Sequence, residues 1–294
     1  MMIGQKEHAI LVGVDGTLAS DEACRYACAE AMAQDLPLRV VHAWLPRSVY
    51  QDGAAKTPPV WGSEASVEGA ARQVLGRAAE LVSSLTPTVK HTEHLVRAAS
   101  PAALVEQSRH AKLLVVGGRE RGRHDLSWLG SVPLHVVPRS RCPVIVVPTD
   151  PRLDGDIVVG LDNSFLTPYV AAFAFEHAAR TGAGLRAVMA FTPAFAGLGP
   201  DSHQEADRRE DTRRVLHHAL EGWREKYPQV AVTEVLSTEH PLRALRTASD
   251  DARLVVVGSH GRGMVWRYAL GSVSSALLRV AACPVVVLGP DAAR

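Results

Sequence analysis

The chain lacks the features that would mark a membrane protein, an exported protein or a nucleic-acid-binding protein. No apolar run approaches the ~20 residues that a helix needs to cross a bilayer. Residues 1–8 do not show the basic and then apolar pattern of a secretory signal. The formal net charge is only +1, so charge gives no reason to expect binding to nucleic acid or to an anionic membrane. We therefore expect a cytoplasmic protein without nucleic-acid or membrane partners.

Cysteine is also scarce, with 4 residues among 294, which suits a reducing compartment. Cys24 and Cys28 lie four residues apart on an expected helix, a spacing that could place two metal ligands. No second Cys or His pair accompanies them, so buried packing within the helix is the favoured interpretation. Cys142 and Cys283 open equivalent Cys-Pro-Val segments. We expect no metal site from these residues.

The sequence repeats itself once, and this repeat determines the expected architecture. Five blocks of the first half return in the same order in the second half, and from Gly117, which matches Gly258, the offset stays at 141 residues. The matched blocks begin at residues 9 and 156, 38 and 185, 100 and 240, 112 and 253, and 130 and 271. A linker rich in Pro, Gly and Asp, residues 147–155, separates the halves. We expect two domains of ordinary size, residues 1–149 and 155–294.

Each half alternates short apolar runs with longer amphipathic stretches, the pattern of a parallel sheet covered by helices. In the first half we expect strands at residues 8–14, 38–43, 88–96, 112–117 and 143–148, and helices at 17–34, at 63–84, from Ser100-Pro101 with Ser100 as N-cap, and from Ser131. The fourth and fifth runs are almost entirely Val, Ile and Leu, as in strands buried on both faces. The expected fold class is α/β: two tandem doubly wound, five-stranded parallel-sheet domains, Rossmann-like, with strand order 3-2-1-4-5.

A glycine-rich segment follows the fourth strand of the second half, and it reads Gly258-Ser-His-Gly261, then nine residues, then Gly271-Ser272. We expect Gly258, Gly261 and Gly263 to let the backbone take positive φ and approach a ligand closely. Backbone amides of such a loop and the start of the following helix both favour an anion, and the hydroxyls of Ser272 and Ser274 could add hydrogen bonds. Asp162 ends the first strand and would lie beside the loop, where it suits ribose hydroxyls or a cation.

These features together predict a site for a nucleoside polyphosphate, and a purely structural loop is the alternative. The loop is not a Walker-type P-loop, because Gly-x4-Gly-Lys-[Ser/Thr] does not occur in the chain. No Gly-x-Gly-x2-Gly segment follows the first strand, which argues against an ordinary dinucleotide site.

The pattern Gly-x2-Gly-x9-Gly-[Ser/Thr] resembles the ATP-binding signature of the universal stress protein family. The opening Val-Gly-Val-Asp-Gly and the closing Cys-Pro-Val-x-Val-Val are similar to that family as well, and the resemblance extends over essentially the whole chain. It implies a tandem protein of the type found in mycobacteria and related actinobacteria, with the adenine nucleotide alpha hydrolase-like fold. In the ATP-binding branch of the family, ATP would bind at the switch point of the sheet, normally with Mg²⁺.

The resemblance also implies the residues that would hold the nucleotide: Asp162 near the adenosine, the Ala190 backbone at adenine, and the glycine loop around the ribose and phosphates. In the second half the candidate cofactor-binding residues are Gly160, Asp162, Ala190, Gly258, Gly261, Arg262, Gly263, Gly271, Ser272, Val273 and Ser274. In the first half they are Gly13, Asp15, Ala43, Gly117, Gly122, Arg123, Gly130, Ser131 and Val132.

The first half departs from the pattern at two positions. Glu120 stands where the second half has Gly261, and Pro133 stands where it has Ser274. The glutamate would add negative charge near phosphates, and the proline removes an N–H and a hydroxyl, although the first helical turn tolerates it. Three arginines at 119, 121 and 123 could pair with phosphate oxygens instead, or could form a solvated loop face. We expect the second site to bind ATP more tightly than the first.

Nothing in the sequence points to a catalytic group, because no general base stands beside the loop. His260 lies within the loop, but we expect its side chain to face solvent, and we expect His42 to be an ordinary strand residue. The leading functional hypothesis is a nucleotide-dependent stress-response regulator with little or no turnover. The alternatives are a slow ATPase or nucleotide-using transferase, and a structural dimerisation module without ligand. A homodimer and an unidentified regulatory protein partner are expected.

Overall fold

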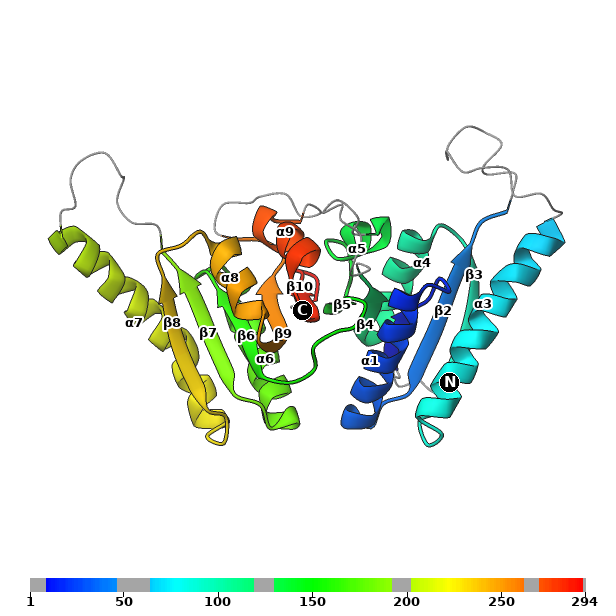
Figure 1. Ribbon diagram of the computed structural model, residues 1–294, viewed down its shortest axis with the longest axis horizontal. Coiled ribbons are helices and arrows are strands. Elements are labelled where there is room, and N and C mark those ends of the chain that lie inside the picture. Colours follow the sequence, from blue (N-terminus) through cyan, green and yellow to red (C-terminus); the bar gives the residue numbers. More distant parts are fainter. Residues whose placement is uncertain (1–8, 47–63, 119–129, 192–201, 262–269, 293–294) are drawn as a thin grey trace, which may run out of the picture. The chain divides into compact units, whose positions relative to one another are not determined.

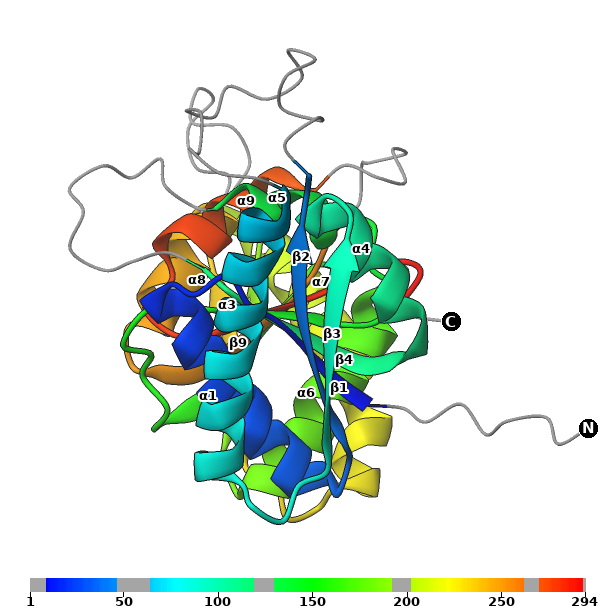
Figure 2. The same cartoon turned by 90° about the vertical axis from the view of Figure 1, so that its right-hand side faces the viewer.

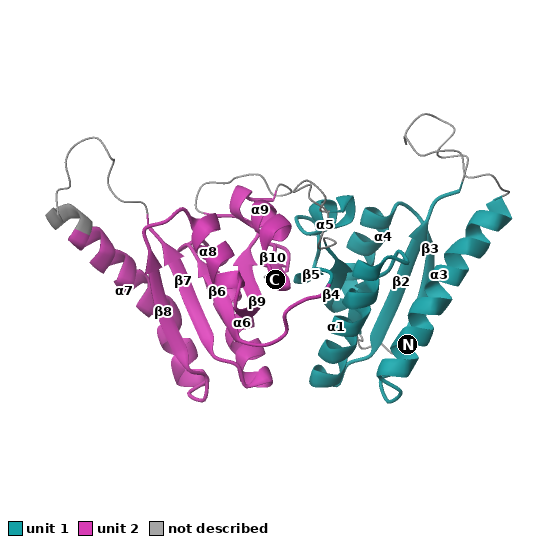
Figure 3. Cartoon of the chain, viewed as in Figure 1, with its two compact units in different colours: residues 1–122, 130–149 teal, residues 123–129, 150–294 magenta. Residues whose placement is uncertain are grey.

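The computed structural model describes residues 9–46, 64–118, 130–191, 202–261 and 270–292 (Figure 1). The chain divides into two compact units, unit 1 and unit 2, and passes from one to the other between Thr149 and Asp150 (Figure 3). Within the described part of the chain, no helix combines the length and the apolar composition that crossing a membrane requires.

Unit 1 alternates strands and helices along the chain. Its elements are β1 (Ala9–Gly13), α1 (Leu18–Gln34), β2 (Leu38–Trp44), α3 (Glu64–Leu85), β3 (His91–Arg97), α4 (Ser100–Gln107), a 3-10 turn (Ser108–His110), β4 (Ala111–Gly117), α5 (Ser131–Val136) and β5 (Val144–Val147).

Unit 2 repeats the same succession. Its elements are β6 (Asp156–Leu161), α6 (Thr167–Thr181), β7 (Leu185–Ala190), α7 (Ser202–Lys226), β8 (Val232–Ser237), α8 (Pro241–Ser249), β9 (Ala252–Gly258), α9 (Ser272–Val280) and β10 (Val285–Leu288).

The strands of each unit form the predicted parallel sheet. Unit 1 has the order β3-β2-β1-β4-β5, and unit 2 has β8-β7-β6-β9-β10, which is 3-2-1-4-5 in both. The expected fold class is therefore confirmed. In this order the first and fourth strands of a unit are neighbours: β1 pairs in parallel with β4, and β6 pairs with β9. The winding direction reverses between them, so their carboxyl ends frame the crevice where ligands of such sheets bind.

The sheets are covered by helices on both sides. In Figure 2, which faces unit 1, α1 and α3 lie on one side of its sheet and α4 on the other. The central strands β1, β4, β6 and β9 are buried over most of their length. The strands β5 and β10 are buried at every position, as their uninterrupted apolar runs predict. Cys24 and Cys28 are also buried, on the side of α1 that packs against the sheet, which confirms their packing role.

Two details of the first unit differ from the prediction. The third strand begins at His91 rather than at residue 88, because a turn closed by the bond from Val89 N to Thr86 O occupies the preceding residues. Ala99, not Ser100, is the N-cap of α4, and it contributes no side-chain hydrogen bond. Pro101 is in the first turn as expected. The equivalent helix α8 has a true side-chain cap, since His240 Nδ1 accepts a bond from Leu242 N.

Candidate functional site

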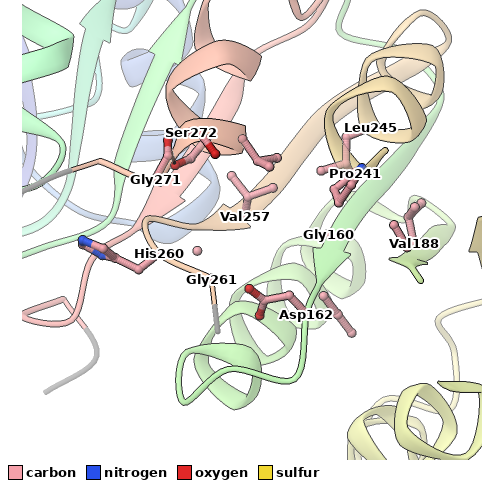
Figure 4. Close-up of a pocket in the computed structure, with 15 residues that line it drawn as sticks. Gly160, Asp162, Val188, Pro241, Leu245, Val257, His260, Gly261, Gly271 and Ser272 are labelled. Atoms are coloured by element: carbon pink, nitrogen blue, oxygen red, sulfur yellow. Dashed lines mark hydrogen bonds between the residues drawn. The ribbon is translucent and has the colours of Figure 1, made fainter. Parts of the chain in front are cut away.

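A cavity of about 400 Å³ opens in unit 2 at the carboxyl ends of β6, β7 and β9 (Figure 4). This volume lies within the range of about 300–1,000 Å³ that is typical of small-molecule sites. The structure brings most of the predicted residues of the second half together in its wall: Gly160, Asp162, Ala190, Gly258, Gly261, Gly271, Ser272, Val273 and Ser274. The first turn of α8 also contributes to the cavity wall, and the sequence did not predict this contribution. The available signal was a proline, Pro241, at the start of the helix that follows the third strand.

Asp162 lies beside the glycine loop, as the strand order predicts. Its Oδ1 accepts a hydrogen bond of 3.0 Å from Ser164 N, which orients the carboxylate at the end of β6. Its Oδ2 lies 3.0 Å from the position that a Cβ on Gly261 would occupy. The acidic side chain and the glycine backbone therefore face the same space, with Asp162 labelled beside Gly261 in Figure 4.

The glycines of this site serve close approach and not an unusual backbone conformation. Neither Gly258 nor Gly261 has positive φ, so that part of the prediction is wrong for these two residues. A Cβ on Gly271 would meet Ser259 O at 2.9 Å, which is closer than real Cβ atoms come to other groups. The left-handed position lies elsewhere, in the turn after the first strand, where Asn163 has φ 58° and its counterpart Gly16 has φ 83°.

The helix that follows the loop begins where the sequence predicts. Gly271 is the N-cap of α9 and has no side chain, so no side-chain oxygen of the cap satisfies the first amide groups of the helix. Ser272, the first residue of α9, is exposed at the cavity. Free amides and the helix dipole make this end of the cavity favourable for an anion. No acidic residue occurs in the first turn of α9 to oppose it.

Two side chains of the loop region behave differently from the prediction. His260 is only 6% exposed, so the expectation that it faces solvent is wrong. Its Nδ1 lies 2.7 Å from Ser259 Oγ, and in Figure 4 its ring points away from Asp162. Ser274 is also buried, and its hydroxyl donates to backbone carbonyls instead of extending into the cavity.

The opposite side of the cavity is apolar. Val188, Ala190, Pro241, Leu245 and Val257 line it, and in Figure 4 Pro241 and Leu245 lie across the cavity from Gly271. Gly160 is required here for space, because a Cβ would stand 3.0 Å from both Leu245 and Val257. The cavity thus offers an apolar half, a carboxylate at its middle and an anion-binding helix end.

Unit 1 has a cavity at the equivalent place, but it measures only about 190 Å³. Of the predicted residues, Gly13, Asp15, Ala43, Gly117, Gly130, Ser131 and Val132 line it. Asp15 Oδ1 is held at 2.6 Å by the hydroxyl of Thr17 and at 3.0 Å by its amide. Pro133 also lines this cavity, at the place of Ser274.

The two cavities differ at the start of the first helix of each unit. Thr17, Ala19 and Ser20 form part of the cavity wall, whereas no residue of α6 lines the cavity of unit 2. The turn packs directly on Gly117, where a Cβ would stand 2.7 Å from the carbonyl of Ala19. At the equivalent Gly258, the nearest atom is the flexible Cδ1 of Leu166, at 3.2 Å.

Several predicted residues lie outside the part of the chain that the structure describes. They are Glu120, Gly122, Arg123, Arg262 and Gly263, together with the arginines at 119 and 121.

Cys24 and His42 belong to the elements in which the sequence predicts them. Burial raises the pKa of the Cys24 thiol to about 12, so the group is a neutral thiol. His42 is a strand residue, as predicted, and its Nδ1 lies 2.7 Å from Val14 O. Among the described residues, no three His, Cys, Asp or Glu side chains lie together as a set that could hold a metal ion.

Two doubly wound parallel sheets in one chain, each with a cavity at its switch point, define a tandem Rossmann-like α/β protein. The family model described as the universal stress protein family matches residues 7–148 and again residues 155–289. The chain therefore belongs to the universal stress protein family, as the motifs indicate.

Relatives of similar length agree with this assignment, and a solved structure has the same fold. The chain is 35% identical to Universal stress protein Rv2005c of Mycobacterium tuberculosis over 296 residues, covering 96% of this chain and 97% of the relative. It is 31% identical to Universal stress protein Rv2623 of the same species over 298 residues, covering 98% of each. A universal stress protein of Archaeoglobus fulgidus matches with a TM-score of 0.73 at 18% identity, over 97% of this chain and 99% of that one.

Proposed function

We propose that unit 2 binds ATP in its cavity, and that the protein is a nucleotide-dependent stress-response regulator with little or no turnover. The observation that carries this proposal is the pairing, within one cavity, of an apolar half with an uncapped helix end. A nucleoside polyphosphate has the same division, with an apolar base at one end and charged phosphates at the other.

The lining residues suggest an orientation for the nucleotide. Adenine would lie against Val188, Ala190 and Leu245, and its binding would remove apolar surface of both the base and these side chains from water. The carboxylate of Asp162 would accept hydrogen bonds from ribose hydroxyls. The phosphates would then extend past Gly261 to the amides at the start of α9.

Magnesium would enter this site mainly through the phosphates. Mg²⁺ bound with nucleotides is commonly held by phosphate oxygens, water and one or two carboxylates. Asp162 is the carboxylate among the described lining residues, so it would be the protein's contribution. When bound, the ion would neutralise phosphate charge near the glycine loop.

Binding without rapid hydrolysis is supported by the side chains beside the loop. Phosphoryl transfer requires a positioned nucleophile and charge stabilisation around the transferred group. The His260 ring points away from Asp162, and the Ser274 hydroxyl is committed to backbone carbonyls. Both residues line the cavity, but neither presents a base or nucleophile beside Asp162.

Unit 1 would be a weaker site or none. Its cavity is less than half as large, and the Asp15 carboxylate is already bonded to Thr17. We further propose that the protein acts in the cytoplasm as a homodimer and transmits its nucleotide state to a regulatory protein partner. Sedimentation of the purified protein with and without ATP would test the dimer.

The decisive experiment is identification of the small molecule that stays with the purified protein. Mass spectrometry after gel filtration should find ATP, in a ratio near one per chain. If ADP forms in a single-turnover assay, the slow enzyme is the better description. If calorimetry detects no ATP binding at millimolar concentration, the proposed function is wrong and a structural module remains.

A further inference from the structure

The carbonyl of Ser259 joins the beginning of the glycine loop to its end. It accepts a hydrogen bond of 2.7 Å from Gly271 N and one of 3.1 Å from Ser274 Oγ. Ser259 N in turn donates to Leu288 O, the last residue of β10, at 2.8 Å. The first residue after β9 is thereby fixed both to the sheet and to the first turn of α9.

The Ser274 hydroxyl is the side-chain part of this connection. It lies 3.1 Å from Ser259 O and 3.1 Å from Gly271 O, so its single proton is shared between two backbone carbonyls. Ser274 is 3% exposed, which protects these bonds from competing water. We call the group formed by Ser259 O, Gly271 and the Ser274 hydroxyl the loop clamp.

The absence of a side chain at Gly271 is necessary for the clamp. A Cβ there would stand 2.9 Å from Ser259 O and 3.3 Å from Ser274 Oγ, in the space the clamp occupies. Gly271 has φ −60°, so any residue could adopt its backbone conformation. The glycine is therefore explained by the closeness of the two loop ends.

Unit 1 provides an internal comparison. Pro133 replaces Ser274 and cannot donate a hydrogen bond. Among the residues that the structure describes, a Cβ on Gly130, the counterpart of Gly271, would meet only Pro133 Cδ within 4 Å, at 3.8 Å. The carbonyl of Gly118, which corresponds to that of Ser259, is therefore not in the same place relative to the helix start. The described part of unit 1 lacks the close contact that defines the clamp.

We propose that Ser274 is a positioning residue. In the nucleotide-free protein it holds the start of α9 against the glycine loop, so the backbone amides of the first turn of α9 are fixed in place before the phosphates bind. A site that is ordered in advance loses less conformational freedom on binding, and its affinity is correspondingly higher. This role differs from direct contact with phosphate, and it rests on the proposed function only for its consequence on ATP affinity.

Amide hydrogen exchange of the nucleotide-free protein tests the clamp directly. In Ser274→Ala, the amides of Gly271 and Ser275 should exchange about five-fold faster, which corresponds to the typical net stabilisation of one hydrogen bond. The amide of Val256, in the centre of β9, should keep its wild-type rate. The matched control is Ser275→Ala, because Ser275 lies on the same helical turn but is not among the cavity's lining residues.

Calorimetry with ATP and with adenosine then tests the positioning role. Ser274→Ala should weaken ATP binding several-fold and leave adenosine binding nearly unchanged, because only the phosphates use the start of α9. A loss of ATP affinity without faster exchange would mean that the hydroxyl acts on the ligand itself, and the proposal would be wrong. Faster exchange with wild-type ATP affinity, or equal losses for ATP and adenosine, would also overturn it. If the wild-type protein binds no nucleotide, the proposed function fails, while the exchange rates still decide whether the clamp exists.

Discussion

Placing a carboxylate at Gly261 should weaken ATP binding in unit 2 more than its size alone can explain. Gly261→Glu imports the residue that unit 1 carries at the equivalent position, Glu120. The new Cβ would stand 3.0 Å from Asp162 Oδ2, a contact that the end of a side chain can relieve by shifting a few tenths of an ångström. The steric effect is therefore modest, and the charge is the larger perturbation.

The size of the expected loss of ATP affinity follows from the geometry of the cavity. A glutamate carboxylate lies beyond its Cβ, which would stand 3.0 Å from Asp162 Oδ2. We therefore take a separation of about 5 Å from Asp162, and a similar one from phosphates bound between the loop and α9, to estimate the charge effect. Gly261 is exposed, so the effective dielectric constant lies between about 20, the value near a protein surface, and about 80, the value of water. Each pair of unit charges at that distance then costs about 1–3 kcal/mol. A triphosphate presents more than one charge, so the ATP dissociation constant should rise at least about tenfold.

Titration calorimetry of nucleotide-free protein with ATP and Mg²⁺ measures this change. Gly261→Gln is the matched control, because glutamine has nearly the same size without the charge. The difference between the Glu and Gln variants should shrink as salt is raised from about 0.05 to 0.5 M, since exposed charges are screened. Equal affinities for the two variants, or undiminished total ATP binding by Gly261→Glu, would refute the placement of the phosphates beside Gly261.

Three further predictions concern the fold. Gly117→Ala should destabilise unit 1 by about 2–3 kcal/mol, because the new Cβ would stand 2.7 Å from the Ala19 backbone. The control Gly76→Ala on α3 has open space around the new Cβ, so it should be neutral or stabilising by up to about 1 kcal/mol. Urea unfolding measures both changes in the free energy of unfolding. Burial lowers the pKa of His177 to about 3, so only the unfolded chain takes up a proton at this residue as the pH falls below about 6.5. The free energy of unfolding of the wild-type protein should therefore drop by about 2 kcal/mol between pH 7 and pH 5. His177→Gln should not show this drop. With its pKa near 12, Cys24 should resist a thiol reagent at pH 8 until the protein unfolds; rapid labelling of the native protein would contradict its burial.

The location of the cavity could be predicted because it depends on topology. The repeat and the continuous apolar runs indicate two parallel sheets, and the order 3-2-1-4-5 makes the first and fourth strands neighbours. Once that order is assumed, Asp162 and Gly258 must end at the same edge, and the structure confirms that both line the cavity. No side-chain contact had to be known for this inference.

The roles of individual residues within the cavity could not be obtained in the same way. A glycine in a loop suggests positive φ, but Gly258 and Gly261 do not have it. At Gly271 the missing side chain leaves room for the carbonyl of Ser259, 12 residues earlier in the chain. A histidine in a polar loop suggests exposure, yet His260 is buried with its Nδ1 against Ser259 Oγ. Both errors arise because local sequence patterns do not specify which distant atoms surround a residue.

The sequence by itself determined the duplication, the class of fold and the edge of each sheet at which a ligand would bind. Those properties follow from hydrophobic periodicity and from the limited ways in which strand–helix units pack. Tertiary structure alone decided that the first turn of α1 lines one cavity and that the Ser274 hydroxyl closes the loop of the other. These outcomes depend on differences of a few tenths of an ångström in the distances between elements. Close packing sets those distances, and sequence patterns do not encode them.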